Sequence, residues 1–465
     1  MYQKRIKGKI VKLKTKFYFL LLLAAAAVTT GFGCTPGSGG GADGLEPINL
    51  SYWSVFNQSD FVSNVINDYR AIHPNINIEF RQLRAEEYEK ELLNALAEDR
   101  GPDIFSIRNT WLQEYLPKIE PLPAQTTLKV RYTQTSLGIK EEVITDTVTE
   151  NSITPGQVRD KFLEVVYDDA IFNNQVYGLP LAVDTLVMYY NRDLFNSAGI
   201  ATPPTNWQEV QQAVKQLTFL DRQGNLAQSG IALGTGENVE RSFDILSLIM
   251  MQNGTIMTQG TKVTFNQGIG NTDYNPGVGA LRFYTDFATP SKEVYSWNSG
   301  QANSLQAFVE GKTAIFFGYS YHMPLIQARG LGRVEVGVAP MPQIKDSNQV
   351  NFANYWLETV SKKTSNVDAA WNFIQFATTR AEEARKYLDS ANRPTALKEL
   401  IEEQKDDDFL RSFAGQLLTA DNWYRGKDAE TVETIFENMI DSVTRDGVGY
   451  ENALELAAQR VQQTY

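Results

Sequence analysis

The segment from Ile48 to Ile107 alternates strand and helix patterns, and this alternation constrains the fold more than any other feature of the chain. Strand patterns cover residues 48–53, 76–80 and 103–107, and apolar residues at helical spacing fill the two intervals between them. Such βαβαβ units build parallel sheets with right-handed crossovers, which bind ligands beyond the carboxyl ends of their strands. The loops at 54–59 and 108–111 are therefore the first candidate site segments.

The composition places the rest of the chain among folded, exported proteins. With 465 residues, of which 42% are apolar and 21% charged, the chain is long enough for two to four domains. Seven basic residues and no acid precede Phe17, which leaves 36 basic against 55 acidic residues in the remainder, a formal charge of −19. Because such a surface repels phosphate backbones, nucleic acid is excluded as a partner.

The first 33 residues have the proportions of a secretory signal peptide. The basic arm is followed by Phe17–Val28, twelve residues without a charge, and signal peptides have an apolar region of roughly 7–15 residues. The uncharged run continues to Cys34, so an uncleaved single membrane anchor is the alternative interpretation. Either reading predicts that the folded part lies outside the cytoplasm.

Cys34 is the only cysteine, which excludes an internal disulfide and any cysteine-based metal or redox pair. Its place after the apolar segment resembles a bacterial lipobox, although Gly31 stands where lipoproteins usually carry Leu. Residues 35–41 form a Gly-rich flexible tether. We therefore predict that residues 34–45 anchor the protein to the cell membrane through a lipidated Cys34.

The residues that commonly carry catalysis are scarce. The only histidines are His73, at a predicted helix end, and His322, which limits both imidazole-based catalysis and zinc binding. Gly311-Lys312-Thr313 looks like the end of a phosphate-binding loop, but Gln306 stands where that loop needs glycine. We expect no catalytic residues, no metal and no cofactor. The 55 acidic residues leave a glycosidase with paired carboxylates as an alternative.

Several further segments have local signatures. Residues 124–160 are poor in aromatic side chains and lack a clear period, so they are interpreted as an elaboration without a predicted role. A capping box at Thr205–Gln208 and the sequence 365–368 each predict the start of a helix. Two amphipathic helices are predicted near the C-terminus, with core faces formed by Val432, Ile435, Phe436, Met439 and Ile440, and by Ala453, Leu456, Ala457 and Val461.

An ordered series of motifs resembles one protein family. These motifs include Leu50-Ser51-Tyr52-Trp53, Gly101-Pro102-Asp103-Ile104-Phe105, Tyr177-Gly178-Leu179-Pro180, Tyr189-Tyr190-Asn191-Arg192-Asp193-Leu194-Phe195, Val338-Ala339-Pro340-Met341-Pro342 and Asn354-Tyr355-Trp356. In order and spacing the chain resembles the bacterial family 1 extracellular solute-binding proteins, the receptors of sugar-importing ABC transporters, whose best-known members are maltose-binding proteins. Residues 124–160 are the main stretch that the resemblance does not cover.

The resemblance implies an α/β, two-lobed periplasmic-binding-protein-like fold of type II, with the ligand in a cleft between lobes joined by a hinge that the chain crosses more than once. It places one lobe at residues 46–182 with 353–392, and the other at 183–352 with 393–465. It also implies a monomeric receptor that binds a mono- or oligosaccharide and delivers it to a membrane permease.

The resemblance also implies site residues. Asp184 falls where similar receptors place an acid that accepts sugar hydroxyls, and an acid just past a hinge strand has no obvious structural purpose. Tyr321 lies near the position of a ligand-stacking Trp, with Tyr319 as the alternative, and Trp356 and Trp423 match aromatic positions near the cleft. Core packing is the competing interpretation for these four aromatic residues.

Sugars present hydroxyl groups at their edges and C–H patches on their faces, so a receptor needs polar side chains for the first and flat rings for the second. The polar candidates are Asp184, Asn57, Gln58, Arg108 and Asn109. The aromatic candidates are Tyr321, Trp356, Trp423 and Trp111. A carbohydrate-active enzyme and a surface scaffold protein with the same fold remain alternatives, and no residue pattern identifies the sugar.

Overall fold

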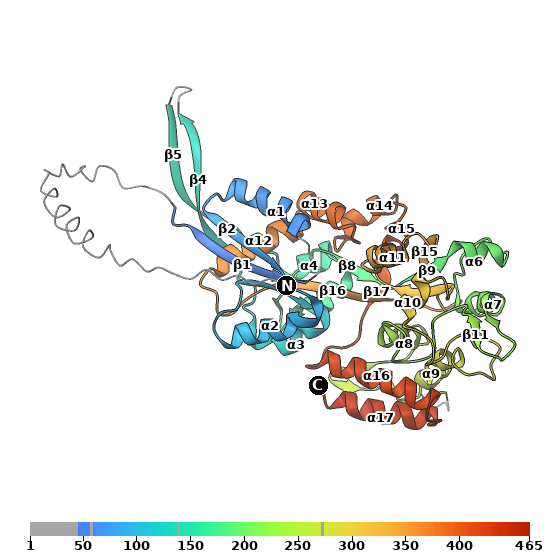
Figure 1. The fold of residues 1–465 in the computed structure, drawn as a ribbon. Coiled ribbons are helices and arrows are strands. Elements are labelled where there is room, and N and C mark those ends of the chain that lie inside the picture. Colours follow the sequence, from blue (N-terminus) through green and yellow to red (C-terminus); the bar gives the residue numbers. More distant parts are fainter. Residues whose placement is uncertain (1–44, 56–58, 137–139, 271–273) are drawn as a thin grey trace, which may run out of the picture. The chain divides into compact units, whose positions relative to one another are not determined.

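The computed structural model describes residues 45–55, 59–136, 140–270 and 274–465. The predicted signal peptide and tether, with Cys34, Asn57 and Gln58, lie outside the described residues. Within them the fold is mixed α/β (Figure 1). No helix in the described part of the chain is long and apolar enough to cross a membrane.

The predicted βαβαβ unit is confirmed, and it forms the first part of a six-stranded sheet. Its elements are β1 (Ile48–Ser54), α1 (Ser59–Ile72), β2 (Ile76–Gln82), α2 (Ala85–Ala97) and β3 (Ile104–Arg108). Strand β1 pairs in parallel with both β2 and β3, so the carboxyl ends of all three strands lie at one edge of the sheet. The residues that follow β1 and β3 therefore meet at this edge, as the pattern predicts.

The six-stranded sheet is completed by strands from distant parts of the chain, in the order β17-β16-β3-β1-β2 with β8 also paired to β16. The added strands are β8 (Val183–Thr185), β16 (Asn351–Val360) and β17 (Ala420–Asp421). The other elements of this first group are η1 (Asn109–Trp111), α3 (Leu112–Tyr115), η2 (Leu116–Lys118), α4 (Pro155–Lys161), α5 (Glu164–Ala170), β6 (Ile171–Phe172), β7 (Gln175–Val176), α12 (Val367–Thr379) and α13 (Ala381–Ala391).

A second group of elements is built around a three-stranded antiparallel sheet, in the order β14-β9-β15. Its strands are β9 (Val187–Asn191), β14 (Ile315–Gly318) and β15 (Val336–Pro340), with two small hairpins β10 (Phe219–Leu220)–β11 (Leu226–Gln228) and β12 (Thr258–Gln259)–β13 (Lys262–Val263). Its helices are α6 (Arg192–Ser197), α7 (Trp207–Leu217), α8 (Ser242–Gln252), α9 (Pro276–Asp286), α10 (Ser304–Val309), α11 (His322–Gly330), α15 (Arg411–Ala414), η4 (Leu417–Thr419), α16 (Ala429–Thr444) and α17 (Tyr450–Gln462).

The chain passes between the two groups through adjacent extended segments. Strand β8 pairs with the first part of β16, and the N–H of Val183 donates to the carbonyl oxygen of Pro394 at 3.2 Å. Strand β17 lies on the other side of the start of β16. After this crossing, η3 (Lys398–Leu400) and α14 (Ile401–Gln404) begin next to the first group, where the N–H of Leu163 donates to Ala396. The lobe boundaries near 182, 352 and 392 stay a prediction. The hydrogen bond from Leu163 to Ala396 favours placing the last of them after residue 396.

Two local predictions differ from the structure by one or two residues. Helix α7 is capped by Asn206, whose side chain accepts from the N–H of Glu209, so the predicted capping box is wrong by one residue. In α17 the side chain of Leu456 is exposed and Leu454 is buried in its place. Small shifts of this kind change which side chain points inward without altering the apolar period.

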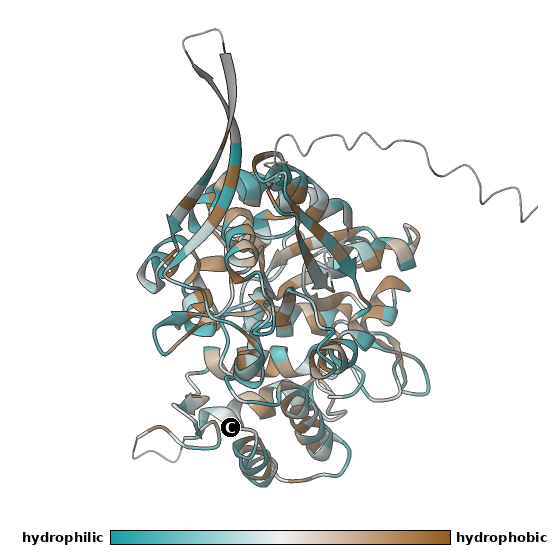
Figure 2. Cartoon of the chain, turned by 90° about the vertical axis from the view of Figure 1, so that its left-hand side faces the viewer, coloured by the Kyte–Doolittle hydropathy of each residue, from teal (hydrophilic) through white to brown (hydrophobic). Residues whose placement is uncertain are grey.

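Residues 124–160 form a long hairpin and a short helix. Strands β4 (Gln125–Ser136) and β5 (Lys140–Asn151) pair with each other in antiparallel register. The hairpin extends away from the sheets in both views (Figures 1 and 2). At its base, Leu128 is buried, and the side-chain amide of Asn372 in α12 donates to Thr126 and Glu150. The base thus belongs to the first group, while Thr145, Thr147 and Thr149 remain exposed.

We predict that the outer part of the hairpin contributes little to the stability of the fold. Replacing residues 132–144 with Asn-Gly joins Arg131 to Thr145, which face each other across the hairpin, through a turn that two-residue hairpins favour. The free energy of unfolding in urea should change by less than about 1 kcal/mol. Leu128→Ala, at the buried base, should cost about 2–5 kcal/mol. A larger loss from the truncation than from Leu128→Ala would contradict the prediction.

Candidate ligand-binding site

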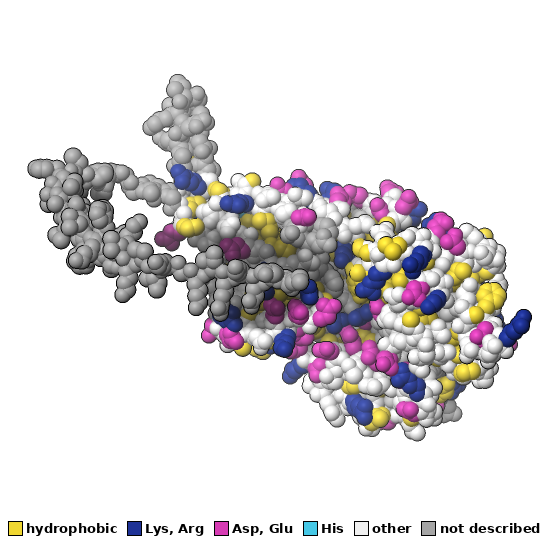
Figure 3. Space-filling view, viewed as in Figure 1, with side chains coloured by type: hydrophobic (Ala, Val, Ile, Leu, Met, Phe, Trp, Pro, Cys, Tyr) yellow, Lys and Arg dark blue, Asp and Glu magenta, His cyan; other side chains and the backbone are white. Residues whose placement is uncertain are grey.

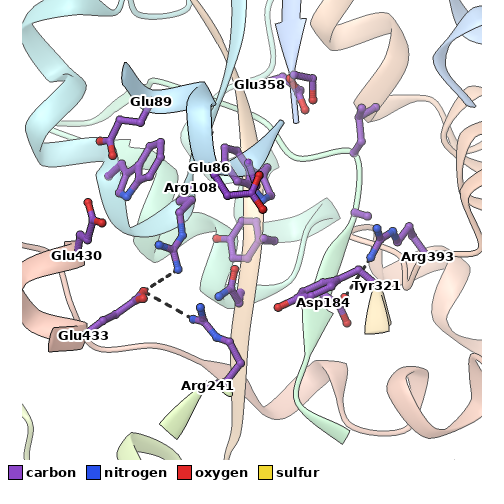
Figure 4. Close-up of a pocket in the computed structure, with 18 of the residues that line it drawn as sticks. Glu86, Glu89, Arg108, Asp184, Arg241, Tyr321, Glu358, Arg393, Glu430 and Glu433 are labelled. Atoms are coloured by element: carbon purple, nitrogen blue, oxygen red, sulfur yellow. Dashed lines mark hydrogen bonds and ion pairs between the residues drawn. The ribbon is translucent and has the colours of Figure 1, made fainter. Parts of the chain in front are cut away.

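A cavity of about 480 Å³ lies between the two groups of elements, at the carboxyl edge of the β1–β3 sheet. Its wall is made by residues from both groups: Ser54, Ala85, Glu86, Glu89, Lys90, Arg108, Trp111, Leu181, Ala182, Asp184, Arg241, Tyr321, Asn354, Tyr355, Trp356, Glu358, Tyr387, Arg393, Glu430 and Glu433. Acidic and basic side chains are intermingled in the middle of the face shown in Figure 3. Figure 4 shows the charged residues of the wall around the cavity.

Asp184, one of the predicted site residues, lies in the wall and is firmly held. Its Oδ2 accepts from the backbone N–H and the hydroxyl of Ser320, at 2.9 and 2.6 Å, and its Oδ1 accepts from the N–H of Thr185 at 2.9 Å. Arg393 lies 3.5 Å from Oδ2 and donates to the hydroxyl of Ser320. Burial raises the pKa of Asp184, and Arg393 and Ser320 oppose that rise. Asp184 therefore has a structural purpose, which sequence reasoning missed.

Tyr321 also lies in the wall, and its ring belongs to a stack. The ring is 4.2 Å from that of His322 and 5.8 Å from that of Tyr319, with near-parallel planes, and the guanidinium of Arg393 lies 5.9 Å from its centre. Nδ1 of His322 accepts from the N–H of Tyr319, which leaves Nε2 to donate to Glu240 at 3.1 Å. The stack holds the Tyr321 ring in place before any ligand arrives.

An ion-pair chain joins the two groups across the cavity. Arg108, at the end of β3, donates to Oε1 of Glu433 in α16 at 2.6 Å, and Arg241 lies 3.7 Å from the same oxygen (Figure 4). Arg241 also pairs with Asp244 at 2.6 Å. Although burial alone raises the pKa of Glu433, Arg108 and Arg241 bring it below its ordinary value. The predicted residue Arg108 is thus placed at the cavity, with a partner from the other group.

Arg241 has an unusual backbone. Its φ of 63° is in the left-handed region, which residues other than glycine rarely occupy. It stands at the N-cap of α8, and its side chain is fixed by the ion pair with Asp244, whose Oδ2 also accepts from the hydroxyl of Tyr319 at 2.5 Å. Strained conformations of this kind persist where the surroundings fix them, and they cluster at binding sites.

The predicted residues Trp111 and Trp356 form an aromatic corner of the wall. Their rings meet edge to face at 5.6 Å, and Trp356 meets Tyr88 in the same way at 5.7 Å. Trp111 stacks on Tyr115 with an interplanar angle of 11°. Arg108 lies 5.8 Å from the centre of the Trp111 ring. The corner therefore combines flat apolar surface with a neighbouring cation.

Three other predicted residues do not line this cavity. Asn109 is buried and donates to Oδ2 of Asp169 at 3.0 Å, as part of a polar cluster beneath β16. Trp423 is buried against Phe243 and Phe436 and donates to the hydroxyl of Ser247. Tyr319 is fully buried. Core packing, the competing interpretation, describes Trp423 and Tyr319.

Sequence reasoning did not single out most of the charged residues in the wall. Arg241 is the N-cap of α8 and Arg393 follows α13, while Glu89, Glu430 and Glu433 lie in the first two turns of α2 and α16. No motif marks any of them. The ion-pair partners of Arg393 and Glu433 lie far away in the sequence, so local patterns could not reveal these pairs. Arg108 and Glu433, for example, are 325 positions apart. In the described part of the chain, no group of histidine, cysteine and acidic side chains has the arrangement of a metal site.

We predict that Asp184→Asn destabilises the ligand-free protein. The amide keeps the shape of the side chain but provides one acceptor oxygen where the carboxylate uses two, so the amide nitrogen would face the N–H groups of Ser320 and Thr185. The free energy of unfolding should fall by about 1–3 kcal/mol. Asp389→Asn, at an exposed position of α13, is the matched control and should change little. Equal denaturation midpoints for the two variants would contradict the structural role of Asp184.

Comparisons with known proteins agree with this geometry. The family model described as "Bacterial extracellular solute-binding protein" matches residues 57–384. A maltotriose-binding protein of Pyrococcus abyssi is 22% identical over 371 residues, which cover 77% of this chain and 68% of the relative. A protein of Brucella abortus named as a binding protein is 36% identical over 64 residues, so the chain spans only 16% of that relative's length.

A solved structure has a similar fold over most of this chain, including both groups of elements. The crystal structure of the cyclic alpha-maltosyl-1,6-maltose binding protein from Arthrobacter globiformis superimposes with a TM-score of 0.70 at 15% identity, covering 90% of this chain and 99% of that one. The predicted two-lobed α/β fold is thereby confirmed. Because the family model covers most of the chain, the protein belongs to the bacterial extracellular solute-binding proteins.

Proposed function

We propose that this protein is the extracytoplasmic receptor of an ABC importer, which binds a mono- or oligosaccharide in the cavity and delivers it to a membrane permease. The observation that carries the proposal is the composition of the cavity wall, which places carboxylates, guanidinium groups and aromatic rings from both groups of elements around one space. Hydroxyl groups of a sugar both donate and accept, and its C–H faces pack on flat rings. The wall supplies partners for all three kinds of contact.

The arrangement supports a receptor that closes around its ligand. Each group contributes part of the wall, and the segments that join them lie side by side beneath it. A ligand that touches both parts binds the closed arrangement more tightly and shifts the population toward it. The permease would then recognise the closed, ligand-loaded form.

Membership of a family of binding proteins supports a carrier that leaves its ligand unchanged. The names of the relatives point in the same direction, since the Pyrococcus protein is named for maltotriose and the Arthrobacter protein for a cyclic maltosyl maltose. The rival function, a carbohydrate-active enzyme, needs two carboxylates with divided acid and base roles. Two of the acids in the wall, Asp184 and Glu433, are both engaged by arginine, which does not suit either of them to an acid or base role.

A glycan panel read by thermal shift tests the proposed receptor. A sugar at 100 times its dissociation constant should stabilise the fold by roughly 2.7 kcal/mol and raise the melting temperature accordingly. Product analysis after incubation should recover the sugar unchanged. Released products would support the enzyme instead, and the absence of any shift across mono-, di- and oligosaccharides would favour a scaffold protein.

Tyr321 and Tyr319 provide a matched pair for locating the ligand. Tyr321→Ala should weaken sugar binding about two- to tenfold, because an aromatic stacking contact contributes roughly 0.5–1.5 kcal/mol. Tyr319→Ala should instead lower the free energy of unfolding by about 3–5 kcal/mol, since that ring is fully buried. Calorimetry with the tightest sugar of the panel measures the first effect, and urea denaturation the second. Unchanged affinity in Tyr321→Ala would remove this residue from the site.

We also propose that the protein is monomeric and held at the cell membrane by a lipid on Cys34. The position of Cys34 between an apolar segment and a Gly-rich tether supports the lipid anchor. Mass spectrometry of the membrane-extracted protein should find a chain that begins at Cys34 and carries at least two acyl chains, because a single chain binds membranes only marginally. An intact chain that begins at Met1 would support the uncleaved anchor instead.

A further inference from the structure

Two acidic side chains from different groups of elements line one side of the cavity, and two further acids lie close enough to interact with them electrostatically. Glu89 in α2 and Glu114 in α3 belong to the first group, and Asp428 and Glu430 stand at the start of α16 in the second. Glu89 and Glu430 both line the cavity and lie close together in Figure 4. The start of α16 therefore faces α2 and α3 with like charges.

The electrostatics of Glu89 reflect this crowding. Burial, followed by repulsion from Glu114, Glu430 and Asp428, raises its pKa to about 7, and Arg108 opposes the rise. Burial also raises the pKa of Glu114, together with Asp428 and Glu430, while Lys118 lowers it. Asp428 and Glu430 belong to the second group of elements, so they come near Glu89 only where the two groups of elements face each other. Separating them would remove Asp428 and Glu430 from its surroundings and return Glu89 to water.

An attractive pair lies in the same interface. Glu430 and Glu433 are three residues apart in α16, so they share one face of the helix, and Glu433 pairs with Arg108 at 2.6 Å. Because Arg108 and Arg241 hold the pKa of Glu433 below its ordinary value, this pair stays charged as the pH falls. Mild acidity thus removes repulsion between the two groups and leaves their attraction in place.

We propose that closing of the cleft is coupled to the uptake of a proton by Glu89, so that the external pH sets how tightly the protein closes on its ligand. This inference rests on the lobe closure of the proposed function. The sign follows from linkage: the state with the higher proton affinity is favoured as the pH falls. Closing brings Glu89 and Glu430 toward each other from opposite groups of elements, so the closed form becomes more stable relative to the open form as the pH falls below about 7.

The direct test measures the separation of the two groups without any sugar. Spin labels at Arg70→Cys in α1 and Gln212→Cys in α7, both exposed positions, report this distance in the full chain with Cys34→Ser. Between about pH 8.5 and about pH 5.5, the fraction of closed molecules should rise through a one-proton transition. A distance distribution that stays the same over this range would overturn the proposal.

Three variants separate proton uptake at Glu89 from a general charge effect. Glu89→Gln should be closed to the same extent at both pH values. Glu430→Gln should keep the transition but move its midpoint to lower pH, because a repelling charge is gone. Glu87→Gln removes an exposed acid of α2 that does not line the cavity, and it should behave as the parent. A parental pH response in Glu89→Gln would overturn the proposal.

The sugar affinity gives an independent readout. With the tightest sugar of the glycan panel, the dissociation constant should rise with pH below about pH 7, by at most about tenfold per pH unit, and level off above it. This slope should vanish in Glu89→Gln. If no sugar binds but the label distance still responds to pH through Glu89, the receptor function fails and the coupling stands. If sugar binds with a slope that Glu89→Gln leaves unchanged, the receptor function stands and the coupling fails.

Discussion

The cavity depends on the pairing of one strand, β16, with strands from several parts of the chain. Its second half is antiparallel to β3, which ends at the site, and its first half lies between β8 and β17, which lead to and from the second group. Trp356, in the part of β16 paired with Arg108, presents its ring to the cavity. The same strand thus fixes the aromatic wall and aligns the crossings about which the two groups can bend.

Buried charge beneath this strand is stabilised by converging donors. Oδ2 of Asp169 accepts from Asn109, from the hydroxyl of Tyr355 and from Asn422, and Arg425 lies 3.2 Å from its other oxygen. Burial raises the pKa of Asp169, and these partners oppose the rise. Removing one partner of such a cluster leaves a buried group unsatisfied, which costs more than an average hydrogen bond contributes. The polar residues at the crossings are therefore organised for structure.

The sequence predicts most of the fold but only part of the site, and the division follows the range of the interactions. The strands and helices of the βαβαβ unit depend on local periodicity, and their order predicts that Arg108 and Trp111 stand at the carboxyl edge of the sheet, where the structure has them. Asp184 and Tyr321 were found through family motifs. The partners that give these residues their roles are distant: Ser320 is 136 positions from Asp184. No period or spacing in the sequence indicates such distant pairs. A match to an aromatic position of the family could not tell a ring that lines the cavity from one that packs in the core, as Trp423 does.

The β4–β5 hairpin can vary in sequence and length independently of the residues that line the cavity. Its two ends, Gln125 and Asn151, face each other in the first register pair, so the chain leaves and re-enters the fold at nearly the same point. Its base is attached to α12, and none of its described residues lines the cavity. Insertions and deletions within the hairpin can therefore accumulate without altering what the cavity recognises. The lineage can lengthen, shorten or decorate this arm while selection on ligand binding acts elsewhere.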